Sequence, residues 1–226
     1  MSIYAIGDIH GCITALKTIF NQGVIKSDDT VVFLGDYADR GINSKAVIDW
    51  LIEHQKNFNF EFILGNHEIM MLNARESQEN FLEWRKYGGA ETLASYQIKE
   101  YSNWINKVDS SHWEFLEACR EYLVIDNFIF VHAGLDANKS LEDQTQSDLC
   151  WKKYEIPTAY NSTNKVICGH TSRKNGKIAD FGHTICIDTY AYGDKWLTCL
   201  NVETGEFLKA NNYAKFKMGR LESFMK

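Results

Sequence analysis

Residues 31–41, VVFLGDYADRG, begin as an apolar run and end in a cluster of charged side chains. The first four residues are apolar and two of them are β-branched, which predicts a buried strand. Asp36 then stands at the C-terminal end of this strand, where a carboxylate can hold a cation. Asp39 adds a second carboxylate, and Arg40 offers a fork of donors that suits a phosphate. A Gly-Asp pair after a strand is common, so this interpretation depends on whether the pattern recurs.

The pattern recurs at four other points of the chain. In each case an apolar run ends in a polar group that can bind a metal ion: residues 2–6 precede Asp8 and His10, residues 58–64 precede Asn66 and His67, the run ending at residue 131 precedes His132, and residues 165–168 precede His170. A lone histidine after a strand is usually an ordinary loop residue. Chance would scatter such residues over both strand ends and the helix faces, so their joint occurrence predicts a metal site.

Helical periodicity separates the first three strands. It predicts helices over residues 12–22 and 44–55, the second with Ser44 as its N-cap. This alternation of strand, motif and helix is typical of a layered α/β protein with parallel strands, in which ligands sit outside the carboxyl ends of the strands.

The second half of the chain is less regular. Residues 69–122 predict helices broken at Gly88-Gly89, which we interpret as a helical cap or insertion within a single domain over residues 1–226. The remaining elements are expected in this order: a hairpin over 122–131, a polar loop over 135–164, a strand over 165–168, a meander of strands over 184–188, 196–202 and 206–209, and a peripheral segment over 210–226.

Composition limits the classes of function. The formal net charge is −6, and the sequence has no run of Lys and Arg long enough to form a basic stripe, which argues against a nucleic-acid partner. No stretch approaches the roughly 20 apolar residues of a membrane span, and six widely spaced cysteines without a CxxC pair suggest reduced thiols. We therefore expect a soluble cytoplasmic protein without a membrane partner. The sequence does not indicate the oligomeric state.

The candidate ligands also restrict the chemistry. Imidazoles, carboxylates and an amide oxygen without a thiolate suit Mn²⁺, Fe²⁺ or Zn²⁺. Six ligands are too many for one ion that must leave a position open, whereas two ions about 3.5–4 Å apart can share a carboxylate and hold a bridging hydroxide. Hydrolysis of a phosphate ester is the reaction that most needs such a pair, because negative charge spreads over the phosphoryl oxygens.

The motifs GDIHG, GDYADRG, GNHE, HAG and GHT, in this order over residues 7–171, resemble those of metallophosphoesterases of the phosphoprotein phosphatase type. The similarity is closest to small bacterial and phage serine/threonine phosphatases. The stretch GGAETLASY (residues 88–96) of this chain also resembles a stretch of the bacterial members. The resemblance implies an α/β sandwich of two mixed β-sheets flanked by helices. It implies two divalent ions, Mn²⁺ first with Fe²⁺ or Zn²⁺ as alternatives, and six ligands: Asp8, His10 and Asp36 for one ion, with Asp36 bridging to a second ion that Asn66, His132 and His170 complete.

The resemblance also implies catalytic roles. His67 would protonate the leaving oxygen, held and charged by Asp39, whose carboxylate would raise the pKa of the imidazole. Arg40 would grip the phosphoryl oxygens, and Asn66 would also contact the phosphate. The nucleophile would be the metal-bridging hydroxide, so no phosphoenzyme is expected. Many members have Trp-x-Arg where this chain has Trp-Lys-Lys, so Lys153 is carried over as a phosphate-binding residue that supplies charge without a bidentate fork.

Three functions remain open at this stage. The leading hypothesis is a serine/threonine protein phosphatase, or a phosphomonoesterase with loose substrate choice, acting on a phosphoprotein or a small phosphoester. The rival enzyme is a symmetrical dinucleoside tetraphosphatase, which differs at the central motif and has Asp after GNH where this chain has Glu68. The third is a non-catalytic scaffold, which should have lost a ligand or the pair of His67 and Asp39.

Overall fold

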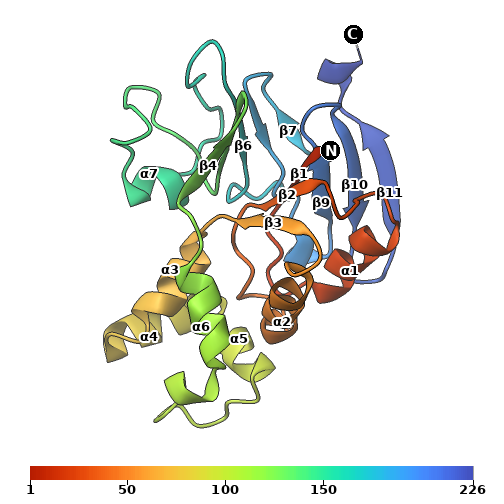
Figure 1. Cartoon of the computed structure of the whole chain (residues 1–226). Coiled ribbons are helices and arrows are strands. Elements are labelled where there is room, and N and C mark those ends of the chain that lie inside the picture. The colour runs from red at the N-terminus through yellow and green to blue at the C-terminus, as the bar shows by residue number, and fades with distance from the viewer. Residues whose placement is uncertain (226) are drawn as a thin grey trace.

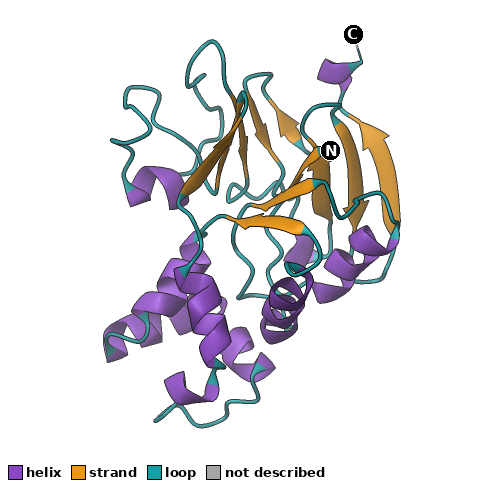
Figure 2. Ribbon diagram, viewed as in Figure 1, coloured by secondary structure: helices purple, strands orange, loops and turns teal. Residues whose placement is uncertain are grey.

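The computed structural model describes residues 1–225, and its strands form two β-sheets (Figure 1 and Figure 2). The six-stranded sheet has the order β11-β10-β9-β1-β2-β3, and the five-stranded sheet has the order β4-β5-β6-β8-β7. The strands of the first sheet are β1 (Ile3–Ile6), β2 (Thr30–Phe33), β3 (Asn59–Phe62), β9 (Leu197–Asn201), β10 (Glu206–Ala210) and β11 (Phe216–Arg220), and those of the second are β4 (Tyr122–Ile125), β5 (Phe128–Val131), β6 (Lys165–Cys168), β7 (Ala179–Asp180) and β8 (Thr184–Cys186).

Each sheet contains three parallel strands with antiparallel neighbours. β1, β2 and β3 run parallel, as do β5, β6 and β8. In the first sheet Ile6 pairs with Phe33, and Phe33 pairs with Phe62, so the three strands end level with one another. The expected pair of mixed sheets is confirmed, and the carboxyl ends of each parallel trio lie at one edge.

Alternation along β2 explains why its sequence is continuously apolar. Val31 and Phe33 belong to the core between this sheet and its helices, whereas Val32 and Leu34 belong to a second core that includes Phe130 of the other sheet. Side chains on successive strand residues point to opposite faces, so both faces of β2 are buried. Fully burying one large aliphatic side chain contributes about 1.5–3 kcal/mol, which fixes the register of the strand.

Most of the helices form two groups in Figure 1. α1 (Ile13–Asn21) and α2 (Ser44–His54) follow β1 and β2, as predicted. A separate group gathers at one end of the sheets: α3 (Asn66–Asn73), α4 (Gln78–Trp84), the kinked turn η1 (Arg85–Gly89), α5 (Ala90–Ser95), the 3₁₀ turn η2 (Ile105–Lys107) and α6 (Ser110–Glu117). This group begins three residues before the predicted start at residue 69, because the Glu68 carboxylate accepts the N–H group of Gly65 and so supports an earlier first turn.

Several local expectations were wrong. Ser44 is the first residue of α2, which follows Asn43, and its hydroxyl accepts the Asp39 N–H instead of capping the helix. Residues 135–164 and 210–226 contain elements that were not expected: α7 (Gln146–Cys150), the strand β11 and the short turn η4 (Glu222–Phe224). A further 3₁₀ turn, η3 (Ala191–Gly193), precedes β9. None of the helices within residues 1–225 combines the length and the apolar character that crossing a membrane requires.

Candidate active site

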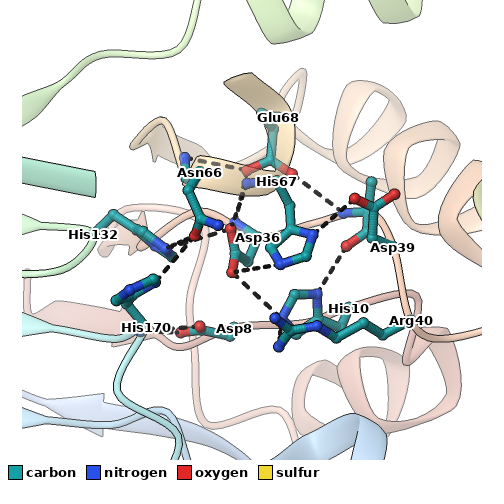
Figure 3. Close-up of polar contacts among 12 residues, drawn as sticks. Asp8, His10, Asp36, Asp39, Arg40, Asn66, His67, Glu68, His132 and His170 are labelled. Atoms are coloured by element: carbon teal, nitrogen blue, oxygen red, sulfur yellow. Dashed lines mark hydrogen bonds and ion pairs between the residues drawn. The ribbon is translucent and has the colours of Figure 1, made fainter. Parts of the chain in front are cut away.

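The loops that follow the parallel strands of both sheets meet around Asp36 (Figure 3). Asn66, His132 and His170 lie on one side of this carboxylate, and His10, Asp39 and Arg40 lie on the other. Asp36 follows β2, and the two histidines of the first side follow β5 and β6 of the second sheet. The predicted residues are therefore brought together from both sheets.

Two imidazoles face the Asp36 carboxylate. His10 Nε2 lies 3.3 Å from Oδ2, and His132 Nε2 lies 3.4 Å from Oδ1. The other ring nitrogen of each histidine donates to a backbone carbonyl, that of Ala38 at 2.8 Å and that of Leu34 at 2.7 Å. Burial lowers the pKa of both histidines well below its usual range, so each ring is neutral and turns a lone pair toward a carboxylate oxygen. Acceptors facing each other at this distance fit a cation between them.

A second group of acceptors lies on the side of Asp36 that faces His132. Asn66 Oδ1 lies 3.0 Å from both His132 Nε2 and His170 Nδ1. His170 Nε2 donates to the Trp151 carbonyl at 2.9 Å, which leaves its Nδ1 as the acceptor. Ligand atoms of Asp36, His132 and His170 all lie within 4.8 Å of one another, as do those of Asp36, His10 and His67. Two divalent ions that share Asp36 therefore fit the donor set.

Asp8 completes the negative charge of the site from the end of β1. Its two carboxylate oxygens accept the N–H of His170 at 3.2 and 3.0 Å. A Cβ atom on Gly169 would lie 2.0 Å from Asp8 Oδ1, so only glycine lets the two loops approach this closely. Burial, followed by the charges of Asp188 and Asp36, raises the pKa of Asp8 well above its usual range. A nearby cation would relieve this repulsion.

Asp188 is a buried residue of the site that the sequence reasoning missed. It is 1% exposed, and it accepts the Ser172 hydroxyl and, at 3.0 Å, the Tyr190 N–H. It follows β8, the third parallel strand of the second sheet, and so obeys the same rule as the other site residues. Residues 184–188, TICID, are an apolar run that ends in a carboxylate, which is the signal used for the other site residues. The predicted meander includes this run, so Asp188 is absent from the predicted site.

Glu68 stabilises the loop that follows β2 and contains residues 34–41, which we call the central loop. Its carboxylate accepts the N–H groups of Asp36 at 2.7 Å, Tyr37 at 2.9 Å, Ala38 at 3.3 Å and Gly65 at 3.1 Å. The loop needs such support because several site residues have a left-handed backbone, which side chains other than glycine rarely adopt. These are His10, Asp36, Asp39, Arg40 and His170, with φ values of 45°, 53°, 71°, 64° and 59°.

His67 and Asp39 form the predicted pair. His67 Nδ1 lies 2.7 Å from Asp39 Oδ2, and both side chains are fully buried. His67 Nε2 is buried without a hydrogen-bond partner among the described residues, and it lies 4.0 Å from Asp36 Oδ2. An orphaned ring nitrogen beside the candidate ligands suits a proton donor or acceptor whose partner belongs to a bound group.

The predicted rise in the pKa of His67 is wrong. Burial lowers the pKa of His67 well below its usual range, and the charges of Arg40 and His170 lower it further. Burial likewise raises the pKa of Asp39 to about 7, against hydrogen bonds from Thr92 and Trp84 that lower it. The sequence shows the carboxylate beside the histidine, but it does not show that both groups are removed from water.

Arg40 and Lys153 line one cavity with His67. The cavity has a volume of about 390 Å³, and His67, Asn66, Trp84 and Trp151 also line it. Arg40 Nη1 donates to His10 Nε2 at 3.2 Å and to the Tyr192 hydroxyl at 2.9 Å, and the guanidinium lies over the Tyr192 ring. Sequence reasoning missed Tyr192, which holds this cation beside the candidate ligands.

Comparison with known proteins defines the class. A family model described as calcineurin-like phosphoesterase matches residues 1–202. The chain therefore belongs to the calcineurin-like phosphoesterase family, a family of metallophosphoesterases, and such membership implies divalent metal ions. The candidate ligands gathered around Asp36 agree with this membership.

Two relatives point to different substrates. An 81-residue stretch is 38% identical to the symmetrical bis(5'-nucleosyl)-tetraphosphatase of Chromobacterium violaceum and covers 34% of this chain and 27% of that protein. A 150-residue stretch is 31% identical to the serine/threonine-protein phosphatase PP2A-like PPG1 of Saccharomyces cerevisiae and covers 63% of this chain and 35% of that protein. The matched regions thus span about a third or less of these relatives.

A solved structure supports the fold. The crystal structure of a proposed diadenosine tetraphosphatase superimposes with a TM-score of 0.68 at 15% sequence identity, covering 96% of this chain and 92% of that one. At this identity the likeness concerns the fold alone.

Proposed function

We propose that this protein is a metal-dependent phosphatase that hydrolyses phosphoserine and phosphothreonine in proteins. The observation that carries the proposal is the pair of His67 and Asp39, because His67, whose Nε2 atom has no hydrogen-bond partner among the described residues, lines the same cavity as Arg40 and Lys153. A proton donor next to two cations suits the transfer of a phosphoryl group away from an alcohol.

The residues would divide the work as follows. The six predicted ligands would hold two divalent ions, Mn²⁺ by preference, and such ions supply positive charge and activate water when bound. Arg40 and Lys153 bind the phosphoryl oxygens. His67 donates a proton from Nε2 to the leaving oxygen, while Asp39 accepts from Nδ1 and stabilises the imidazolium. A phosphate dianion beside His67 favours the protonated ring and so opposes the effect of burial on its pKa.

The lining of the cavity favours a single phosphoryl group. Arg40 and Lys153 are the only Lys or Arg side chains among the residues that line the described cavity, and Glu83 adds a carboxylate. Besides the two divalent ions, a tetraphosphate chain would find only these two cations in the lining of this cavity. The exposed aromatic side chains of Tyr87 and Trp151 offer apolar surface to the residues that flank a phosphorylated side chain.

A symmetrical dinucleoside tetraphosphatase is the second candidate. The similarity to the enzyme of Chromobacterium violaceum favours it, although that similarity covers 34% of this chain. The central motif GDYADRG and the Glu68 of GNHE favour the phosphatase instead.

A paired assay on Mn²⁺-loaded protein tests the proposal. It compares phosphate release from a phosphoserine or phosphothreonine peptide with cleavage of diadenosine tetraphosphate, with the Asp36→Asn variant as the blank. Preference for the peptide is expected. Preference for the dinucleotide would overturn the proposal in favour of the second candidate, and activity on neither substrate with metal bound would indicate a scaffold.

A further inference from the structure

The Asp39 carboxylate has two hydrogen-bond donors besides His67. Trp84 Nε1 lies 2.9 Å from Oδ2 and 3.1 Å from Oδ1, so the indole straddles both oxygens. The Thr92 hydroxyl donates to Oδ1 at 2.7 Å and accepts the backbone N–H of Asp39 at 2.9 Å. Trp84 and Thr92 are both 0% exposed, as is Asp39 itself. Neither residue belongs to the ligands, the phosphate-binding residues or the catalytic pair.

These donors come from the helical group and not from the sheets. Trp84 is the last residue of α4, and Thr92 lies in α5. The turn η1 joins the two helices through a kink at Gly88, whose carbonyl accepts the Arg40 N–H at 3.4 Å. The turn places both donors on the same carboxylate.

The geometry of this network constrains His67. The Trp84 indole and the Thr92 hydroxyl fix where each Asp39 oxygen lies, and Oδ2 in turn sets the position of His67 Nδ1 at 2.7 Å. Ring orientation then decides where Nε2 points. A hydrogen-bonded network without exposed members holds such an orientation more rigidly than one bond could.

We propose that Trp84 and Thr92 are positioning residues that orient Asp39 and, through it, the His67 imidazole toward the leaving oxygen. This inference rests on the proposed function, in which His67 protonates that oxygen. It also assigns a chemical role to the helical group, which would supply part of the machinery for proton donation. A purely structural role would stabilise the fold without affecting one leaving group more than another.

The test compares two esters in Mn²⁺-loaded protein. An alkyl phosphate needs its leaving oxygen protonated. A nitrophenyl phosphate needs the acid far less, because its leaving group is nitrophenolate, a stabilised anion. Thr92→Val removes the hydroxyl at nearly constant shape, and Thr92→Ser restores it. Thr198→Val is the matched control, because Thr198 is also 0% exposed but its hydroxyl bonds Thr189 and not Asp39.

Selective loss is the expected result. Misplacing a reacting group by about 1 Å can cost about 100-fold in rate, so Thr92→Val should lose roughly 10- to 100-fold in kcat on the alkyl ester and much less on the nitrophenyl ester. Thr92→Ser should recover most of that loss, and Thr198→Val should behave like wild type. Equal losses on both esters in Thr92→Val would overturn the inference. Trp84→Phe, which removes the indole N–H, gives a second variant if Thr92→Val does not fold.

A further variant separates this inference from the proposed function. His67→Asn should lose activity selectively on the alkyl ester. If it does not, or if wild type hydrolyses neither ester, the proposed proton donor is wrong. If His67→Asn is selective and Thr92→Val and Trp84→Phe are not, only the positioning role is wrong.

A spectroscopic measurement does not depend on turnover. The proton between His67 Nδ1 and Asp39 should give a downfield imidazole resonance that disappears in His67→Asn. This resonance should shift in Thr92→Val and stay in place in Thr198→Val. An unchanged resonance in Thr92→Val would contradict the positioning role.

Discussion

At the scale of single residues, Asp36 and His67 should separate metal binding from proton donation. Asp36 lies between both groups of candidate ligands, so Asp36→Asn should lose bound metal and activity together. His67 Nε2 faces the same space, but the side chain is held by Asp39, so His67→Asn should retain metal and lose about 10²- to 10⁴-fold in kcat. Metal analysis of the purified variants and steady-state kinetics measure the two effects.

The control for this comparison is the metal content of wild type purified in parallel. If Asp36→Asn keeps its full complement of metal, the carboxylate does not bridge two ions. If His67→Asn loses metal, this imidazole is a ligand, as its distance to the Asp36 and His10 ligand atoms also permits.

The sequence could predict most of the site at this scale because single residues at strand ends carry it. Asp8, Asp36, His132 and His170 all follow apolar strands, and parallel strands bring their carboxyl ends to one edge. Trp84 could not be found in this way. It reads as one more apolar residue of an amphipathic helix, and only its indole N–H, pointing at Asp39, shows another role.

At the scale of elements, the kinked turn η1 is where the helical group contacts the central loop. Gly88 has φ +120°, and a Cβ atom there would lie 2.5 Å from the Arg40 nitrogen and 2.9 Å from Asp39 Cβ. Gly88→Ala should therefore push the turn away from the loop and reduce both stability and kcat. Backbone strain of about 1–2 kcal/mol and overpacking of about 1–3 kcal/mol set the expected loss of unfolding free energy.

Gly182→Ala is the matched control for this variant. Gly182 also has a positive φ, of +82°, but a Cβ atom there meets open space. Only the backbone strain should remain, and kcat should not change. Urea unfolding and kinetics on the alkyl ester measure both variants. If Gly88→Ala resembles Gly182→Ala in both measurements, the contact between the turn and the loop contributes neither to stability nor to kcat.

The sequence predicted the long periodic elements better than the short ones. β2 and α2 pack apolar side chains into the core, and this burial gives each a clear periodicity in the sequence. Both lie where that periodicity predicts them. α7 spans five residues, which is too short for a helical period, and it begins with the reciprocal hydrogen bonds of Thr145 and Asp148. β11 is exposed at all five positions, so it has no apolar alternation, and backbone pairing with β10 defines it.

At the scale of the whole molecule, the candidate metal centre joins the two sheets. Asp8, Asp36 and Asn66 follow strands of the six-stranded sheet, whereas His132 and His170 follow strands of the other. The centre also gathers buried carboxylates whose pKa values burial and mutual repulsion raise. Bound divalent ions would therefore stabilise the packing of the two sheets as well as equip the site for reaction.

Metal should consequently raise the melting temperature of the protein. A ligand that binds only the folded state at 100 times its Kd adds about 2.7 kcal/mol, which corresponds to roughly 5–10 °C for a chain of this size. Thermal unfolding of wild type with Mn²⁺ and with a chelator measures this shift. The shift should persist in His67→Asn, because the wild-type imidazole bonds Asp39 through Nδ1 and is not one of the six predicted ligands. It should be lost in Asp36→Asn, which removes the shared carboxylate. A full shift in Asp36→Asn would place the stabilising ions elsewhere on the molecule, and the two sheets would then be held together by their apolar core without help from the site.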